Sequence, residues 1–239
     1  MLRHFNRPEH ETIAKLLRNM DQGFFLDSRC WFGGGTAIVM THGEYRLSLD
    51  VGFLCSDMQG YRVLRGIAVE HGVEGLFGAD VEPLREVRAD QYGIRAAVKF
   101  NDQAIKIEIV REGRISLDGA LDAELGAPLL SRPDMFAEKL LANADRGQDP
   151  SIGYRDAIDL GMLLADEGAF PAVAIAKAES AYGVDIERKM RWVARKLSDE
   201  AELKRAAERL MMGEDLAKLA MERVSRAIAR AWPTAQGTF

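Results

Sequence analysis

Residues 31–55 read WFGGGTAIVMTHGEYRLSLDVGFLC, and this stretch decides how the rest of the chain is interpreted. It ends in an alternating run, LSLDVGF, over residues 47–53. Alternation with a period of two indicates a β-strand whose successive side chains point to opposite faces. The polar face of this strand comprises Ser48, Asp50 and Gly52. The apolar face comprises Leu49, Val51 and Phe53. We therefore expect a strand that buries one face and presents a carboxylate beside a glycine on the other.

Three consecutive glycines, residues 33–35, precede this strand. They favour a tight turn whose backbone N–H groups can approach a phosphate. Nearby hydroxyl groups and an arginine fork would add hydrogen bonds to such an anion. The candidate phosphate ligands are Gly34, Gly35, Thr36, Arg46 and Ser48. The turn is not a P-loop, because no Gly-Lys-Ser/Thr follows it. A glycine turn can also mark nothing more than a sharp bend.

The chain has 239 residues and a net charge of −5, which argues against binding of polyanions by the whole molecule. Its charge is nevertheless uneven. Residues 188–230 hold 12 Lys and Arg against 7 Asp and Glu, an excess of five positive charges. A basic lobe of this kind can meet RNA or an acidic protein. A solvated helical surface with many ion pairs is the more common explanation of such a pattern.

The cysteines and apolar segments bear on the cellular setting. Cys30 and Cys55 flank apolar segments, so we expect both to be buried free thiols. The four histidines, at 4, 10, 42 and 71, show no zinc-binding spacing with them. Arg3, His4 and Arg7 lead into a polar stretch, so we expect no signal peptide, and no apolar run is long enough to span a bilayer. We expect a cytoplasmic protein that does not enter a membrane.

Periodicity and turn residues predict a chain that begins as mixed α/β and ends as nearly continuous helix. The expected strands cover residues 30–32, 47–53, 84–88, 92–100 and 104–110, with a tight hairpin at Asn101-Asp102. The expected helices cover residues 9–20, 36–42, 60–71, 134–146, 154–167, 170–181, 185–197, 199–211 and 215–231. Residues 113–133 are rich in turn formers and are expected to link the two halves.

A second carboxylate lies on the last expected strand. Ile105, Ile107 and Ile109 alternate there with polar residues, so Glu108 points away from the apolar face. Glu108 is a candidate partner for Asp50. The alternative, a surface glutamate on an edge strand, is equally consistent with the pattern.

The glycine turn and the strand carboxylate resemble the DNA-polymerase-β-like nucleotidyltransferase superfamily. The closer resemblance is to the AbiEii-like toxin family of abortive-infection and type IV toxin–antitoxin systems. Its pattern is roughly Gly-Gly-Thr followed by Arg-x-Ser-x-Asp-x-Asp. The segments 34–36 and 46–50 match it, but the second aspartate is replaced by Gly52. Losing that carboxylate should lower the reaction rate by orders of magnitude.

Two later segments also resemble this family. RPDMFAEKLLANADR, residues 132–146, places Lys139 and Arg146 on one helical face, and YRDAIDLGMLL follows at 154–164. In the family such a lysine contacts the triphosphate and an aspartate of the second helix assists the site. Carried over, Lys139 is a phosphate ligand and Asp159, or Asp156, is the acidic partner. The alternative is an ion-pair network of Arg or Lys with Asp that joins the two helices, and this alternative is favoured for Arg155 and Asp156.

The resemblance, which covers roughly residues 30–165, implies both a fold and an activity. It implies an α/β (α+β) nucleotidyltransferase core with a small mixed sheet over residues 1–125, and a helical domain over residues 126–239, with the active cleft between them. It implies transfer of a nucleotide from a nucleoside triphosphate to an RNA acceptor, such as a tRNA end, or to a protein. A cognate antitoxin is the implied protein partner.

The implied cofactor is Mg²⁺, which takes carboxylate and phosphate oxygens. Two such ions clamp the attacking and leaving oxygens in phosphoryl chemistry. Asp50 and Glu108 are the candidate metal ligands, and Asp50, Glu108 and Asp159 are the candidate catalytic residues. Because of Gly52, a second hypothesis stands beside the enzyme. It is a catalytically degenerate protein of this fold that binds nucleotide or RNA, or serves as an interaction module.

Overall fold

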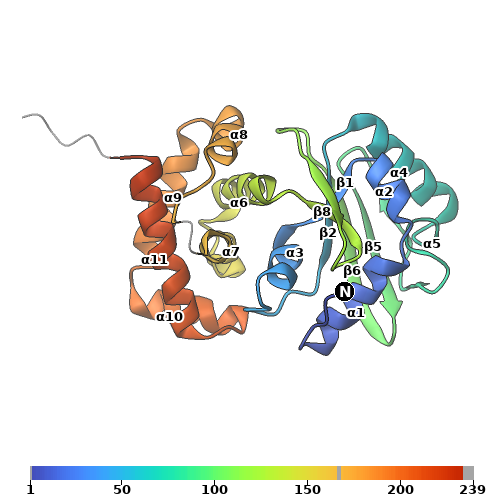
Figure 1. Ribbon diagram of the computed structural model, residues 1–239, viewed down its shortest axis with the longest axis horizontal. Coiled ribbons are helices and arrows are strands. Elements are labelled where there is room, and N and C mark those ends of the chain that lie inside the picture. Colours follow the sequence, from blue (N-terminus) through green and yellow to red (C-terminus); the bar gives the residue numbers. More distant parts are fainter. Residues whose placement is uncertain (1, 166–167, 234–239) are drawn as a thin grey trace, which may run out of the picture. The chain divides into compact units, whose positions relative to one another are not determined.

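The computed structural model describes residues 2–165 and 168–233, and its elements gather into two compact units (Figure 1). The sheet unit comprises Met1–Glu44 and Ser48–Ser131. The helical unit comprises Tyr45–Leu47 and Arg132–Phe239. The three residues Tyr45–Leu47 are therefore grouped with the helical unit because of their contacts. Their neighbours in the chain, Glu44 and Ser48, belong to the sheet unit.

The sheet unit is built on a mixed sheet of eight strands among the described residues. Its order is β3-β5-β6-β2-β1-β8-β7, and β4 pairs with β5. The pairs β2–β6 and β1–β8 are parallel, and the others are antiparallel. The strands are β1 (Cys30–Gly33), β2 (Val51–Cys55), β3 (Glu82–Pro83), β4 (Arg88–Ala89), β5 (Gly93–Phe100), β6 (Gln103–Arg111), β7 (Gly119–Asp122) and β8 (Ala127–Leu130). The predicted mixed α/β class is confirmed.

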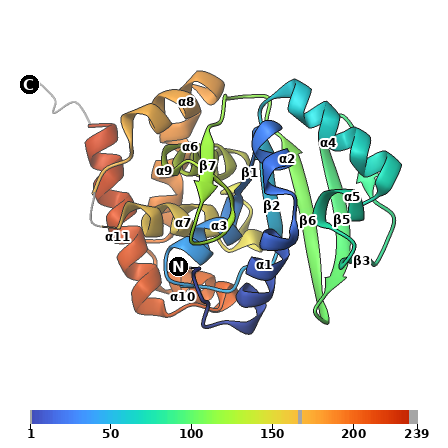
Figure 2. The same cartoon turned by 45° about the vertical axis from the view of Figure 1, so that its right-hand side comes forward.

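The long hairpin of β5 and β6 forms where alternation predicts it (Figure 2). Asn101 and Asp102 close it with φ of 46° and 63°, the left-handed conformation that a tight two-residue hairpin turn requires. Ile105, Ile107 and Ile109 are buried, while Lys106 and Glu108 are exposed. The predicted faces of this strand are thus confirmed.

An aromatic cluster fills the space between the sheet and the helices of the same unit. Phe53 of β2 lies 4.9 Å from Phe25 and 5.9 Å from Phe77, measured between ring centroids. The helices are α1 (Pro8–Asn19), α2 (Gln22–Asp27), α3 (Gly34–Thr41), α4 (Met58–His71) and α5 (Glu74–Phe77). Helix α3 lies across the sheet from the other four, so it covers the face opposite to this cluster (Figure 1).

Three strand predictions need correction. The strand expected over residues 47–53 begins only at Val51, because side chains take the backbone carbonyls of Ser48 and Asp50 before a ladder can. The strand expected over 84–88 is replaced by two short strands, β3, which ends before it, and β4, which begins at its last residue. The expected linker over 113–133 contains β7 and β8, whose pairing depends on the distant strand β1.

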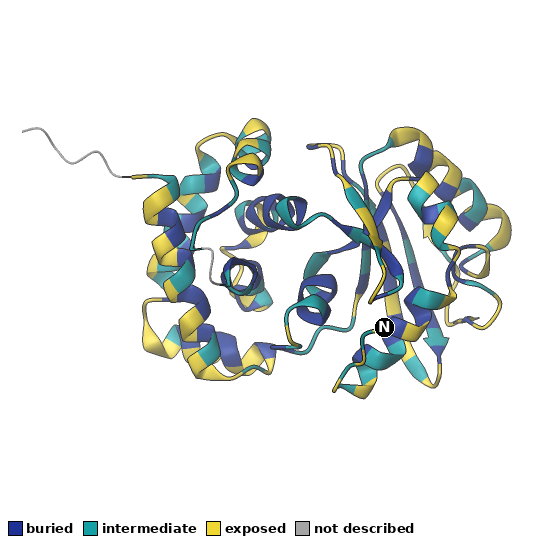
Figure 3. Cartoon of the chain, in the orientation of Figure 1, coloured by how far each residue is buried: buried dark blue, intermediate teal, exposed yellow. Residues whose placement is uncertain are grey.

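The helical unit consists of six α-helices and one short 3₁₀ helix among the described residues. Helix α6 contacts α7, α8 and α9, and α7 packs closely against α11. A Cβ atom at Gly161 would lie 2.2 Å from the carbonyl oxygen of Ala220, so this crossing requires glycine. Large parts of α6 and α7 are buried (Figure 3). The helices are α6 (Arg132–Arg146), η1 (Pro150–Ile152), α7 (Arg155–Leu164), α8 (Ala172–Tyr182), α9 (Asp185–Lys196), α10 (Glu200–Leu210) and α11 (Glu214–Ala231).

All the predicted helices of this region form, with ends that differ by a few residues. The predicted end of the second helix at residue 167 lies outside the described residues. Within the described part of the chain, every helix is too short or too polar to cross a membrane.

Candidate functional site

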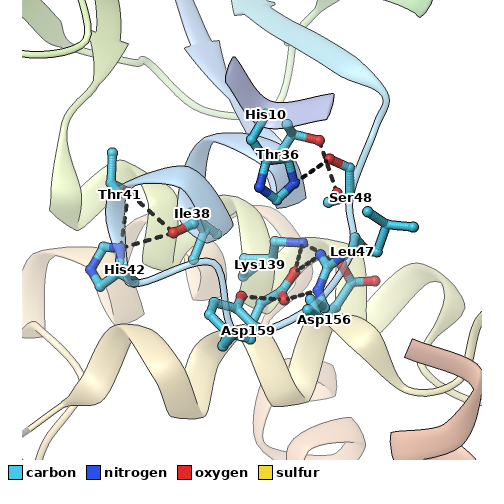
Figure 4. A network of polar contacts seen from close by, with 12 residues as sticks. His10, Thr36, Ile38, Thr41, His42, Leu47, Ser48, Lys139, Asp156 and Asp159 are labelled. Atoms are coloured by element: carbon cyan, nitrogen blue, oxygen red, sulfur yellow. Dashed lines mark hydrogen bonds and ion pairs between the residues drawn. The ribbon is translucent and has the colours of Figure 1, made fainter. Parts of the chain in front are cut away.

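The glycine turn and the segment that carries Asp50 are tied together in the sheet unit (Figure 4). Thr36 Oγ1 donates to the backbone carbonyl of Asp50 at 2.6 Å. It therefore accepts from Ser48 Oγ, which lies 2.8 Å away, because a hydroxyl has one proton to donate. Gly34, at the start of α3, has φ of 75°, which favours glycine. The two hydroxyl groups thus fix the turn beside the residue that carries an exposed carboxylate.

A buried histidine beside Thr36 also contacts this segment (Figure 4). His10 of α1 contacts Glu44 Oε1 through Nδ1 at 2.8 Å and the carbonyl of Ser48 through Nε2 at 3.1 Å. Burial raises the pKa of Glu44, but hydrogen bonds from the N–H groups of Asn6 and Arg7 and from His10 outweigh it, so the pKa is lowered. Glu44 and Ser48 flank Tyr45–Leu47, and His10 anchors both ends of this segment.

Glu108 lies beside the position where the family pattern has its second aspartate. In the parallel pairing of β2 and β6, Gly52 is the register partner of Glu108. Gly52 also pairs with Gly33 of β1, and Glu108 pairs with Arg95 of β5. These four residues form one row across the sheet, and residues paired in register share a face. A carboxylate at position 52 would stand next to Glu108.

The glutamate in this row is only partly engaged. Arg95 Nε donates to Glu108 Oε1 at 3.0 Å, and Arg95 NH1 also lies 3.4 Å from Asp90 Oδ2. The side chain of Glu108 is 51% exposed. Among the described residues, no group of three or more His, Cys, Asp or Glu is arranged to hold a metal ion.

The remaining candidates gather in a buried salt-bridge cluster of the helical unit (Figure 4). Its centre is Asp159 of α7, which is fully buried. Arg46 binds Asp159 through two hydrogen bonds, from Nε to Oδ1 at 2.8 Å and from NH2 to Oδ2 at 2.9 Å. Tyr45 donates its hydroxyl to Oδ1 at 2.6 Å, and Lys139 Nζ lies 2.6 Å from Oδ2. Both carboxylate oxygens are thus shared by two donors each.

Asp156 extends this cluster by one helical turn. Lys139 Nζ lies 2.8 Å from its Oδ1, so the lysine bridges both aspartates of α7. Arg146 donates to Asp156 from Nε at 2.8 Å and from NH2 at 3.0 Å. Three cations and two carboxylates leave the cluster with one excess positive charge. The bidentate geometry makes these pairs strong and specific.

The pKa directions follow from this arrangement. Burial raises the pKa of Asp159, but Arg46 and Lys139 outweigh burial and lower it. The same balance, with Lys139 and Arg146 as the cations, holds the pKa of Asp156 well below its usual range. Burial and the Asp159 charge raise the pKa of Tyr45. Both aspartates are therefore ionised and Tyr45 is protonated at neutral pH.

The predicted site residues fall into two groups within the two units. Gly34, Gly35, Thr36, Ser48, Asp50 and Glu108 belong to the sheet unit. Arg46, Lys139 and Asp159 belong to the helical unit, where they contact one another, together with Asp156. The ion-pair network that sequence offers as an alternative for Lys139 and Asp159 is present.

Sequence reasoning missed two members of these groups. The sequence spacing of His10 indicates no zinc site and suggests no other role for it. It falls on the same helical stripe as Ile13 and Leu17, both buried, and a histidine on an apolar stripe signals a buried hydrogen-bonding role. Tyr45 carries no such signal, because its partner Asp159 is 114 residues away in the chain.

Comparisons with known proteins agree with this description. The profile of the family described as "Nucleotidyl transferase AbiEii toxin, Type IV TA system" matches residues 15–232. A comparison with curated proteins gave no significant match. Among solved structures, a "putative nucleotidyltransferase" from Helicobacter pylori aligns with a TM-score of 0.55 and 16% identity, covering 93% of this chain and 94% of that one. JHP933 from Helicobacter pylori aligns with a TM-score of 0.55 and 17% identity, covering 94% of each.

At these identities the two structures establish a shared fold, and the family profile establishes kinship over most of the chain. The match begins within α1 and ends after α11, so it includes the glycine turn, the Asp50 segment and the salt-bridge cluster. The chain therefore belongs to the AbiEii nucleotidyltransferase toxin family of type IV toxin–antitoxin systems.

Proposed function

We propose that this protein transfers a nucleotide from a nucleoside triphosphate to an RNA acceptor, such as a tRNA end, or to a protein. The observation that carries the proposal is the Thr36 contact with Ser48 and with the carbonyl of Asp50. It supports a site in which the glycine turn meets phosphate oxygens while Asp50 faces them. Gly34, Gly35, Thr36 and Ser48 are the proposed phosphate ligands in the sheet unit.

Lys139 and Arg46 keep their proposed roles as phosphate ligands, and Asp159 keeps its role as acidic partner. The buried cluster supports these roles in one way: it holds more positive than negative charge. Lys139 is 5% exposed and engaged by two carboxylates, so a phosphate must compete with Asp156 and Asp159 for its ammonium group. Asp159 therefore acts on the two cations that surround it, by fixing their positions.

Mg²⁺ is the proposed cofactor, with Asp50 and Glu108 as its protein ligands. When bound, it would neutralise phosphate charge and orient the triphosphate. Both Cys30 and Cys55 are buried free thiols, which supports the reducing cytoplasm as the setting of this reaction. A cognate antitoxin is the proposed protein partner, since the family is that of a toxin–antitoxin system.

Incubation with each of the four α-labelled nucleoside triphosphates, Mg²⁺ and total RNA tests the proposal. The wild-type protein should label RNA or protein with one triphosphate in preference to the others. Asp50→Asn should abolish the label while the melting temperature stays close to that of the wild type. Undiminished labelling by Asp50→Asn would remove Asp50 from the site.

The second candidate function is nucleotide binding without transfer, and Gly52 favours it. A Cβ atom at this position would meet only the carbonyl oxygen of Gly33, at 3.4 Å, so the first atom of a side chain fits there without a shift of the backbone. Under this hypothesis the wild type binds a triphosphate and Gly52→Asp gains transfer activity. Binding is read from a rise in melting temperature with Mg²⁺ and triphosphate, because a ligand of the native state stabilises it. Absence of both binding and gain would reject this candidate.

A further inference from the structure

A pocket of about 270 Å³ opens in the helical unit. It shares no lining residue with the salt-bridge cluster. It is lined by Gln148, Arg188, Lys189, Trp192 and Arg195. All but Gln148 belong to α9, at intervals of three, four and seven residues that place them along one side of the helix. None of these residues has a part in the proposed transfer reaction.

The pocket carries positive charge that the surrounding chain does not neutralise. Arg188 forms an ion pair with Asp185 at 2.8 Å. Lys189 donates to the side-chain oxygen of Gln148, a neutral group. In the described part of the chain, neither Lys189 nor Arg195 lies within salt-bridge distance of a carboxylate. The pocket thus retains two positive charges and selects for an anion, and it forms part of the basic lobe of residues 188–230.

An aromatic wall stands among these cations. The indole of Trp192 is half-buried and lies 6.3 Å from the ring of Tyr154, with an angle of 46° between the ring planes. Tyr154 is itself buried, so this contact orients the tryptophan. Aromatic side chains beside cations bind single-stranded nucleic acid by stacking on bases while the cations contact phosphates. An acidic peptide would use the cations but would have no need of the indole.

We infer that this pocket binds one nucleotide of a single-stranded polynucleotide. The base packs on Trp192, the flanking phosphates contact Lys189 and Arg195, and the amide of Gln148 hydrogen-bonds to the edge of the base. A single strand is required, because a base within a duplex is stacked and paired and presents no free face. Binding at this pocket needs neither a nucleoside triphosphate nor Mg²⁺. It therefore stands or falls separately from the proposed transfer reaction.

Fluorescence anisotropy of the full chain with labelled 12-nucleotide RNA and DNA strands of the same mixed sequence, without triphosphate or metal, tests this inference. Trp192→Ala should weaken binding by about 5- to 150-fold, the range expected for loss of one stacked base. Trp192→Phe should retain most of the affinity, because it keeps an aromatic face. A preference for the RNA strand identifies the 2′-hydroxyl as part of the recognised group, and equal affinities identify a general single-strand site.

Charge is tested with a matched pair of double variants. Lys189→Gln with Arg195→Gln should weaken binding and lower the slope of log K against log salt by about 1.4, since each phosphate contact to a single strand contributes about 0.7. Lys218→Gln with Arg226→Gln removes the same charge from exposed positions of α11, within the same basic lobe, and should leave the slope unchanged.

Several outcomes would overturn the inference. They are absence of binding at 50 mM salt, equal losses in the two double variants, and unchanged affinity of Trp192→Ala for RNA. Binding of polyglutamate as tightly as RNA, without any effect of Trp192→Ala, would identify a site for an acidic protein instead. Circular dichroism melts establish that each variant folds. Should Trp192→Ala unfold, Trp192→Phe and the charge variants still decide the matter.

Discussion

The candidate residues of the sheet unit and those of the helical unit differ in how far the protein itself satisfies them. Asp50 is exposed, and Glu108 is half-exposed with one arginine as its partner. Asp159, by contrast, is fully buried and shares its two oxygens among a tyrosine, an arginine and a lysine. The carboxylates of the sheet unit are accessible to a ligand, whereas a ligand of the helical unit must compete with ion pairs that are already formed.

This difference separates two reasons for which a charged residue can belong to a family pattern. The formation of a buried ion pair requires desolvation of both charges. The removal of one partner then leaves the other charge uncompensated in the interior. An exposed pair contributes little to stability, so its residues are free to serve a ligand. Substitutions in the two units should therefore divide into those that damage folding and those that damage only activity.

The largest expected effect is that of Asp159→Ala. It leaves Arg46 and Lys139 buried without their shared partner, and should lower the free energy of unfolding by about 3–5 kcal/mol or prevent folding. Urea denaturation followed by circular dichroism measures the loss. Glu108→Ala is the matched control from the sheet unit, with an expected change below about 1 kcal/mol. Equal losses of unfolding free energy in the two variants would contradict the expected difference between the sheet unit and the helical unit.

Asp50→Asn should have the next largest effect, on activity alone. Loss of an outer partner of a metal site commonly costs about 10- to 100-fold, so loss of a ligand should cost on the order of 100-fold or more in transfer rate. The free energy of unfolding should change by less than about 0.5 kcal/mol, as for other exposed positions. Rates from single-turnover labelling and urea denaturation of the same preparation give both numbers. A stability loss that matches the activity loss would assign Asp50 a folding role.

Acid should act on the helical unit through its two aspartates. The pKa values of Asp156 and Asp159 are lowered in the folded state, so the unfolded chain takes up protons first as the pH falls. Their stabilisation is fully present above the unfolded pKa of about 3.8 and is lost as the pH falls through the lowered values of the folded state. The slope of the unfolding free energy between pH 5 and 3 should be shallower in Asp156→Asn. An unchanged slope would show that other carboxylates control acid unfolding.

The smallest expected effect is that of Arg95→Ala, which removes the partner of Glu108. Both side chains are about half-exposed, at 43% and 51%, and such pairs contribute up to about 1 kcal/mol. The unfolding midpoint in urea should barely move. If the ion pair competes with a metal for Glu108, the Mg²⁺ concentration required for half-maximal triphosphate binding should fall. A large loss of stability would instead place this row of the sheet among the structural contacts.

Much of the fold could be predicted because it depends on local patterns. The isoleucine alternation in β6, the Asn101-Asp102 turn and the helical periodicity of α6 to α11 each specify an element from neighbouring residues alone. Strands β7 and β8 could not be predicted in this way, because Ala127–Leu130 is a short apolar run that becomes a strand only by pairing with β1. Ser48 and Asp50 fall within the predicted strand but lie outside β2, because His10 and Thr36 take their carbonyl oxygens.

The candidate site could be predicted in outline but not in its contacts. Motif spacing brings Thr36, Ser48 and Asp50 together, since all three lie within 15 residues of chain. The partnership of Arg46 with Asp159 joins residues 113 apart, and no sequence pattern specifies it. Its consequence, that an arginine of the glycine-turn motif is buried among helices, follows only from the three-dimensional structure.

The space at Gly52 has a consequence for engineering this protein. A Cβ atom built at position 52 comes no closer to another residue than 3.4 Å, the distance to the carbonyl oxygen of Gly33. This is an ordinary van der Waals contact, so the first atom of a new side chain fits without a shift of the backbone. The Asp-x-Asp spacing can therefore be rebuilt with a single substitution at this position.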